Sequence, residues 1–271
     1  MPQVINTNIP SLNAQRNLNT SQGSLNTALQ RLSSGLRVNS SKDDAAGLAV
    51  AEKMNAQARG MTVAIRNAND GLSLAQTAEA GMNVIGEHLQ RMRELAVQAA
   101  SGQYDSANRA ALDTEYQQLA SEINRVISAT NFNSKQLLDG TFATPVDFQV
   151  GASTTGESQI GIKIDKVNAT FGSISSSAAD ALSQISALDV AINSINNNRA
   201  SLGAIQNRFE GVLNQLSAAH ENTEAARGRI MDADYASETA KMARSQVLQQ
   251  AGVAMLAQAN SLPQNVLSLV R

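Results

Sequence analysis

The chain has 271 residues, which is enough to bury a sizeable core in one large domain or two modest ones. Lys and Arg number 21 and Asp and Glu number 23, so the net charge of −2 gives no electrostatic reason to expect nucleic acid or an anionic membrane as partner. Cysteine is absent and there are two histidines, which excludes disulfides, thiolate nucleophiles and any site that needs three imidazoles.

The composition favours a mainly helical chain. Aromatic residues make up 3% of the chain and Trp is absent, so the core suits close helix–helix packing better than a large ligand pocket. The four prolines leave two stretches of more than 100 residues without Pro, and nothing in those stretches forbids long helices. We therefore expect a mainly α fold of long antiparallel helices in a coiled-coil rod, with a small β-hairpin near the chain midpoint.

The two ends of the chain carry almost no charge. Arg16 is the single charged residue in residues 1–30, and residues 245–270 contain none. Amides interrupt the C-terminal run, which argues against a membrane helix, and the N-terminus lacks the features of a secretion signal. We expect both ends to be buried against other protein, because uncharged amides tolerate desolvation better than ions. Disordered tails are the alternative, and the heptad pattern of both ends argues against them.

In chain order, the first predicted element is an amphipathic helix near the N-terminus. Leu18, Leu25 and Leu32 are seven residues apart, as are Leu29 and Leu36. This spacing places them on one stripe that packs against a partner helix.

A second helix is predicted to begin at Ser41, whose hydroxyl would cap it, with Asp43 and Asp44 at the positive end of the helix dipole. Residues 69–71 (NDG) resemble a turn that a helix could still traverse, and residues 102–106 predict a helix–helix connection. Further heptads in this half are Met82, Leu89 and Ala96 with Ile85, Met92 and Ala99, then Leu112, Leu119 and Val126 with Tyr116 and Ile123.

Between residues 140 and 177 the apolar period changes to two. Val146, Phe148 and Val150 alternate with polar residues, as do Ile160, Ile162 and Ile164 after a Gly-, Ser- and Thr-rich stretch. This pattern predicts one β-hairpin with an apolar face.

The C-terminal half returns to heptads, which we interpret as one uninterrupted helix from about residue 179 to residue 260. At 1.5 Å per residue such a helix would be about 120 Å long. The first part of its stripe is Leu188, Ile195, Leu202, Phe209, Leu216, Thr223 and Ile230, and the second part is Leu248, Met255, Leu262 and Leu269.

Several long motifs at both ends of the chain resemble those of bacterial flagellins, in the same order. The N-terminal motifs are residues 33–39 (SSGLRVN), 42–47 (KDDAAG), 66–71 (RNANDG) and 89–98 (LQRMRELAVQ). The C-terminal motifs are residues 229–236 (RIMDADYA) and 259–267 (ANSLPQNVL). The difference is at the midpoint, where many flagellins insert variable outer domains and this chain has about forty residues, so it resembles a short form of the family.

The resemblance implies a structural subunit that is exported unfolded, polymerises into the extracellular flagellar filament and serves motility. It implies an inner coiled-coil domain of residues 1–40 and 233–271 and a second-layer domain of residues 41–232. The partners implied are other copies of the chain, the flagellar export apparatus, an export chaperone on the C-terminus, and the filament cap and hook-junction proteins. The residues expected to carry self-assembly are Leu18, Leu25, Leu29, Leu32, Leu36, Leu248, Met255, Leu262 and Leu269.

The resemblance also implies one recognition site. In flagellins that the vertebrate receptor TLR5 recognises, a second-layer helix presents a motif similar to Gln90, Arg91, Glu94, Leu95 and Gln98, with a neighbouring Glu that matches Glu115. An Arg and a Leu four residues apart share a helix face, and we expect a charged anchor beside an apolar one. Burial between subunits of a filament would explain the same residues without a receptor.

The residues predict no catalytic centre, cofactor or metal site, and we expect no enzyme, no nucleic acid partner and no membrane insertion. Residues 220–224 (HENTE) differ from a zinc-protease motif in having Glu in place of the second His, so we interpret them as a solvated helix face. Asp232, Asp234 and Glu238 lack calcium-loop spacing and are expected to cap a helix. Two other functions remain open: a hook–filament junction protein, and a surface adhesin or glycan-binding protein that would use Phe142, Phe148 and Phe171 as an aromatic platform.

Overall fold

The computed structural model describes residues 7–153, 158–168 and 170–269, with side chains described as far as residue 261. Within these residues no helix is long and apolar enough to span a membrane. In chain order, the elements are α1 (Ile9–Ser34), α2 (Ala45–Ala100), α3 (Ser106–Ala129), β1 (Asn131–Phe132), β2 (Lys135–Gln136), β3 (Val146–Gln149), β4 (Gln159–Ile162), α4 (Ala178–Met231) and α5 (Tyr235–Leu269). The predicted mainly α fold with small β elements is confirmed.

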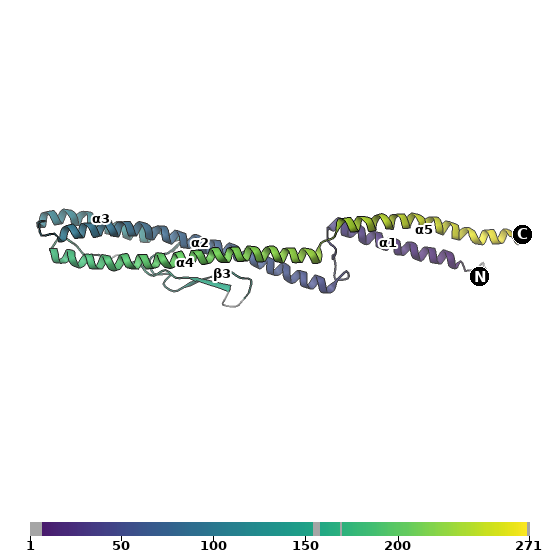
Figure 1. Cartoon of the computed structure of the whole chain (residues 1–271), viewed down its shortest axis with the longest axis horizontal. Helices are drawn as coiled ribbons and strands as arrows, with labels where there is room; N and C mark the ends of the chain where they lie inside the picture. The colour runs from purple at the N-terminus through teal and green to yellow at the C-terminus, as the bar shows by residue number, and fades with distance from the viewer. Residues whose placement is uncertain (1–6, 154–157, 169, 270–271) are drawn as a thin grey trace. The chain divides into compact units, whose positions relative to one another are not determined.

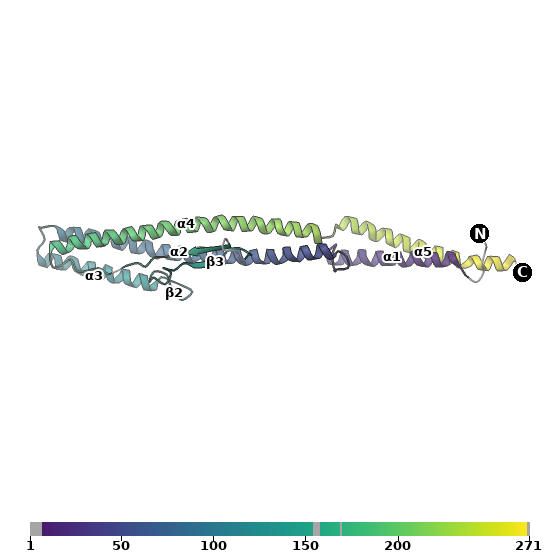
Figure 2. The ribbon, with the colours of Figure 1, turned by 90° about the horizontal axis from the view of Figure 1, so that it is seen from below.

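The chain divides into two compact units. The terminal unit contains Met1–Ala56 and Asn222–Arg271, and the central unit is Gln57–Glu221. In the central unit α2, α3 and α4 run side by side (Figures 1 and 2). Contacts such as Arg93 with Asp189 and Thr62 with His220 show that α2 and α4 are antiparallel.

The core of the central unit is built from the predicted heptads. From α2 and α3 it takes Met82, Ile85, Leu89, Met92, Tyr116 and Ile123, and from α4 it takes Leu188, Ile195, Leu202 and Phe209, all of which are buried. Burial of one stripe from each helix is what holds long amphipathic helices together, since each apolar side chain contributes about 1.5–3 kcal/mol when fully buried.

The predicted β-hairpin is confirmed, and its apolar face packs onto the helices. Strands β3 and β4 are antiparallel, with Val146 opposite Ile162 and Phe148 opposite Ile160. The Phe148 ring meets Phe209 of α4 edge to face, with ring centroids 6.1 Å apart. Phe142 is buried and Phe148 and Phe171 pack against the same core, so these rings form no exposed aromatic platform.

A second, very short hairpin was not predicted. Strands β1 and β2 pair through Phe132 and Lys135, and the two residues between them, Asn133 and Ser134, have φ angles of 48° and 63°. Two consecutive positive φ angles are typical of the tight turn that matches strand twist, and Asn tolerates that conformation.

One detail of the predicted helices is wrong. Helix α2 begins at Ala45, capped by Asp44, whose carboxylate accepts a hydrogen bond from the Gly47 N–H at 2.8 Å; Ser41 precedes it. Asp43 instead accepts bonds from the backbone of residues 39 and 40. The helix also continues through residues 69–71, because Gly71 has to lie against Phe209 and a turn there would expose that ring.

The predicted uninterrupted helix over residues 179–260 is also wrong, because α4 ends at Met231 and α5 begins at Tyr235. The backbone between them pairs with the segment after α1: Leu36 bridges to Asp232, and the Ala233 N–H donates to the Gly35 carbonyl at 2.9 Å. Asp234 then caps α5 by accepting from the Ala236 N–H at 2.9 Å, as predicted for this acidic segment.

Candidate functional site

The terminal unit is organised by an antiparallel pair formed by α1 and α5 (Figure 1). The Ser11 hydroxyl donates to Asn260 Oδ1 at 2.8 Å, and the Asn8 amide donates to the Ala259 carbonyl at 2.8 Å. At the other end of α1, Arg31 forms an ion pair with Glu238 at 3.4 Å. The start of α1 therefore lies beside the C-terminal part of α5, and the end of α1 lies beside the start of α5.

The surface between α1 and α5, which we call the pair seam, follows heptad spacing on both helices. From α1 it contains Ser11, Ala14, Leu18, Ser21, Leu25, Ala28 and Leu32, which are buried or half-buried. From α5 it contains Glu238, Met242, Ser245, Gln249, Gly252, Leu256 and Ala259, which are buried or half-buried as well. Spacings of three and four residues on both sides are those of a coiled coil.

The α5 side of the pair seam is mostly small and polar, with Met242 and Leu256 as its large apolar residues. A Cβ atom on Gly252 would lie 3.2 Å from Leu18 Cδ1, so the leucine of α1 fills the space that the glycine leaves. Ser245 and Ala259 lie one heptad to either side of Gly252 and are buried. The large apolar residues of this seam are only half-buried, so the α1–α5 pair gains little stability from its own contacts. They are Leu18, Leu25, Leu32, Met242 and Leu256.

The residues predicted to carry self-assembly do not share one surface. Leu18, Leu25 and Leu32 lie in the pair seam, Leu36 packs in a small cluster with Val38 and Met231, and Leu29 is exposed. Leu248 and Met255 lie outside the pair seam and are 50% and 64% exposed. The side chains of Leu262 and Leu269 lie outside the described residues.

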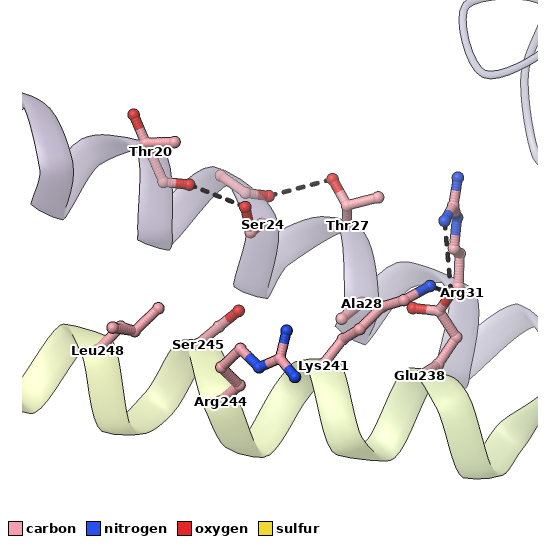
Figure 3. A pocket seen from close by; sticks show the side chains of 11 residues that line it. Thr20, Ser24, Thr27, Ala28, Arg31, Glu238, Lys241, Arg244, Ser245 and Leu248 are labelled. Atoms are coloured by element: carbon pink, nitrogen blue, oxygen red, sulfur yellow. Dashed lines mark hydrogen bonds and ion pairs between the residues drawn. The ribbon is translucent and has the colours of Figure 1, made fainter.

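A groove of about 590 Å³ runs along the α1–α5 pair next to Leu248. Figure 3 shows its two walls: the hydroxyls of Thr20, Ser24 and Thr27 on α1 and the long basic side chains of Lys241 and Arg244 on α5. Each of the three hydroxyls donates to a carbonyl of its own helix. The Cβ of an alanine at Gly23, which also lines the groove, would meet nothing within 4 Å.

Glu238 is the buried charge of the pair seam. Its carboxylate accepts a hydrogen bond from Lys241 at 2.8 Å and pairs with Arg31 at 3.4 Å (Figure 3). The bond from Lys241 and the positive charge of Arg31 lower the pKa of this carboxyl below its usual value, although burial acts in the opposite direction. Glu238 is therefore ionised at neutral pH.

The predicted recognition residues lie on adjoining faces of α2 and α3. Arg91 forms ion pairs at 2.9 Å with Glu94 one turn away and with Glu115 on α3, and both hydrogen bonds raise the pKa of its guanidinium. Gln90 and Gln98 are exposed. Leu95 is 1% exposed, so the apolar anchor expected beside Arg91 lies in the core, because position 95 falls on the buried stripe of α2.

The described residues offer little to catalysis. No group of three or more His, Cys, Asp or Glu residues there is arranged to hold a metal ion. His220 of the HENTE segment is half-buried and its Nε2 lies 3.3 Å from the Thr62 hydroxyl of α2. This contact links α2 and α4, and the HENTE segment is part of the surface of α4.

Comparison with known proteins places this architecture in a family. The model of the bacterial flagellin N-terminal helical region matches residues 5–143, and that of the bacterial flagellin C-terminal helical region matches residues 185–270. The chain belongs to the bacterial flagellin family. As a member it is a structural subunit that self-assembles into the flagellar filament.

The relatives of this flagellin-family chain match it along its whole length. It is 44% identical to a flagellin of Halalkalibacterium halodurans, covering 99% of this chain and 100% of that protein. It is 41% identical to a flagellin of Bacillus subtilis, covering 98% and 99%. The crystal structure of Bacillus cereus flagellin covers 60% of this chain and 94% of that chain, with 32% identity and a TM-score of 0.50.

Proposed function

We propose that this subunit polymerises through its terminal unit, and that neighbouring copies cover the outer stripe of α5 and the groove beside it. The observation that carries this proposal is the exposure of Leu248 and Met255, two large apolar side chains one heptad apart that flank the face of α5 packed on α1. With Ala251 between them they make a second three–four spacing, which we call the outer stripe. Exposed contiguous apolar surface of this kind marks a protein interaction site.

Assembly would also complete the stability of the terminal unit. The pair seam is rich in small and polar side chains, so the terminal helices gain little from pairing alone. Burial of the outer stripe by another copy supplies the missing apolar contact and couples the order of these helices to polymerisation. A repeated head-to-tail contact that does not close into a ring produces a filament.

The first experiment is negative-stain electron microscopy of the purified chain after addition of filament seeds and a precipitating salt. We expect filaments from the full chain and none from a variant that lacks residues 1–40. Failure of the full chain to polymerise on seeds would contradict the proposal and favour a junction or surface-binding protein.

A point substitution tests the groove without removing a helix. Gly23→Leu adds a side chain where a Cβ meets nothing within 4 Å, so the α1–α5 pair tolerates it while the groove is filled. We expect Gly23→Leu to abolish seeded growth and Gly23→Ala, the matched control, to preserve it. Normal growth of Gly23→Leu would show that no neighbouring copy enters the groove.

For the domain organisation, we infer that the inner filament layer is formed by residues 1–40 and 233–271 and the second layer by residues 41–232. The resemblance to the family supports this division, and so does the pairing of the two end segments in α1 and α5. Export as an unfolded chain, contact with an export chaperone at the C-terminus, and contacts with the filament cap and hook-junction proteins come from the same resemblance. Together they give an extracellular protein of the flagellum.

We also infer recognition of the free subunit by TLR5 through the exposed charged face of α2 and α3. The support is geometric: Arg91 lies 2.9 Å from carboxylates of both Glu94 and Glu115, and Gln90 and Gln98 extend the polar face along α2. Leu95 supports this face from the core and does not touch a partner directly. The surface is polar and preorganised, so Arg91 is its expected anchor.

A further inference from the structure

The two paired terminal helices contain a single carboxylate side chain between them. Within Ile9–Ser34 and Tyr235–Leu269 the sequence contains one acidic residue, Glu238, against four basic residues, which are Arg16, Arg31, Lys241 and Arg244. Glu238 is also 4% exposed, in the pair seam, although acidic residues are almost always at the surface. Because this carboxylate is buried, it contributes little to solubility, and its presence in the pair seam requires another explanation.

Apart from the hydrogen bonds that link Gln249 to Gln22 and Asn260 to Ser11, the rest of α5 carries little information about its partner. Ser245, Gly252 and Ala259 are small residues spaced one heptad apart, so a shift of α5 by seven residues would place one small residue where another had been. Backbone bonds between residues 35–38 and 231–233 hold the base of the pair, but backbone groups accept any sequence. Neither feature discriminates between α1 and a second α5.

Glu238 does discriminate, because one of its two cations belongs to the other helix. Lys241 lies on α5 and accompanies Glu238 in every possible pairing. Arg31 belongs to α1 and reaches Glu238 only in the observed orientation and register. In a shifted pair the carboxylate would lie against Leu25 instead. In an antiparallel pair of α5 helices that meet at Gly252 it would lie opposite the uncharged segment of residues 245–270. Removing one partner from a buried charge pair is strongly unfavourable, whereas the intact pair is close to neutral.

We propose that Glu238 is the specificity-determining residue of terminal-helix pairing: its contact with Arg31 selects α1 over another α5 and selects one register of the antiparallel pair. This inference rests on the proposed assembly, in which many copies of both helices meet at high local concentration. Specificity then comes from rejecting wrong pairs more than from stabilising the right one.

The absence of cysteine makes the pairing directly measurable by disulfide cross-linking of the full chain. A Cβ on Gly252 would lie 3.8 Å from Leu18 Cβ, which is about the Cβ separation of a relaxed disulfide. Leu18→Cys with Gly252→Cys therefore reports the native register within one chain. Ser11→Cys with Gly252→Cys reports the shift of one heptad that brings Glu238 against Leu25, and Gly252→Cys alone reports α5–α5 pairing between chains.

We expect the native cross-link to dominate in the otherwise unchanged chain. Glu238→Leu should raise the shifted and interchain cross-links relative to the native one by at least about tenfold, because the penalty on wrong pairs is lost. Glu238→Gln should act in the same direction, and it keeps the size of the side chain. Lys241→Gln is the matched control and should leave the ratio unchanged. Exchange of the two residues, Arg31→Glu with Glu238→Arg, should restore the native cross-link.

Unchanged cross-link ratios in both Glu238→Leu and Glu238→Gln would overturn this inference, as would an equal effect of Lys241→Gln. The proposed function is tested separately by seeded polymerisation of the unmodified chain. If that chain polymerises and the ratios do not respond to Glu238, the filament function stands and the role of Glu238 falls. If that chain does not polymerise, the proposed function fails whatever the cross-links show.

Discussion

Gly71 of α2 and Phe209 of α4 lie so close that a Cβ on the glycine would be 2.7 Å from Phe209 Cζ and 3.3 Å from Phe148 Cδ1. The missing side chain is therefore the space into which two phenylalanine rings pack. This contact fixes the β3–β4 hairpin on the helices of the central unit, because Phe148 comes from β3. It also explains why a helix continues through residues that resemble a turn.

Gly71→Ala should destabilise the central unit by about 1–3 kcal/mol, since the added methyl group forces a fully buried ring to move. The intrinsic preference of alanine for helices, about 1 kcal/mol over glycine, only partly offsets this loss. Thermal unfolding of the two variants measures it, with Gly211→Ala on α4 as the control, because a Cβ there meets nothing within 4 Å. Equal melting temperatures for the two variants would show that the rings adjust freely.

Tyr116→Phe should stabilise the central unit or leave it unchanged, in contrast to most core substitutions. The Tyr116 ring is fully buried and its hydroxyl has no hydrogen-bond partner in the described part of the chain. A buried polar group without a partner costs about 1–3 kcal/mol, and removal of the oxygen relieves that cost. Chemical denaturation measures the change. A loss of stability in Tyr116→Phe would mean that an ordered water satisfies the hydroxyl.

The same residue predicts sensitivity to alkali. Burial, with a smaller contribution from the charge of Asp113, raises the pKa of Tyr116 to about 12, whereas an unfolded chain ionises it near 10.0. A raised folded pKa gives stability that is complete below pH 10 and is lost as the pH rises toward 12. The free energy of unfolding should therefore fall over that window, and the fall should be smaller in Tyr116→Phe. Parallel curves for the two proteins would exclude Tyr116 as the cause.

Acid should loosen the α1–α5 pair through Glu238. The hydrogen bond from Lys241 and the charge of Arg31 lower the pKa of Glu238 below its ordinary value of 4.5, so its contribution is present above that pH and is lost as the pH falls through the lower folded pKa. The protection of α1 amides from hydrogen exchange, relative to an unfolded chain at the same pH, should therefore fall in acid. In Glu238→Gln this loss of protection should be weaker; identical profiles would place the acid-sensitive group elsewhere.

Arg91→Ala should strongly reduce activation of a TLR5 reporter cell by purified monomer without lowering the melting temperature noticeably. Its ion pairs with Glu94 and Glu115 are exposed, and exposed pairs contribute little to stability. Arg93→Ala is a matched control, because Arg93 is exposed to a similar degree and pairs with Asp189 of α4. If the monomer does not activate the receptor, or if the two variants behave alike, the recognition proposal is wrong.

Much of the central unit could be predicted from the sequence because regularly spaced large apolar residues indicate which face of a helix or strand is buried. Leu188, Ile195, Leu202 and Phe209 recur every seven residues and all are buried, and the alternation around Phe148 identified the hairpin. The break at residues 232–234 could not be predicted in the same way. It depends on backbone bonds to residues almost two hundred positions earlier in the chain. No local sequence pattern predicts such a pairing.

The terminal unit shows the opposite behaviour. Counting large apolar residues identified Leu248 and Met255, which lie on the outer stripe, and passed over the small and polar residues that face α1. Gly252 and Ser245 carry no hydrophobic signal, although their size is what lets the helices approach. The same reasoning missed Leu95, since an Arg and a Leu four residues apart share a face only approximately, and that offset places Leu95 in the core.

The antiparallel order of α1 and α5 has a practical consequence for engineering. Because Asn8 bonds to Ala259 and Ser11 to Asn260, the start of α1 and this part of α5 lie together. A fluorescent label attached near Asn8 and one attached near Asn260 would therefore crowd the same place, beside the surface that neighbouring copies are proposed to cover. The connection between β3 and β4 belongs to the other unit, and it is the position at which a foreign peptide could be displayed while both ends stay native.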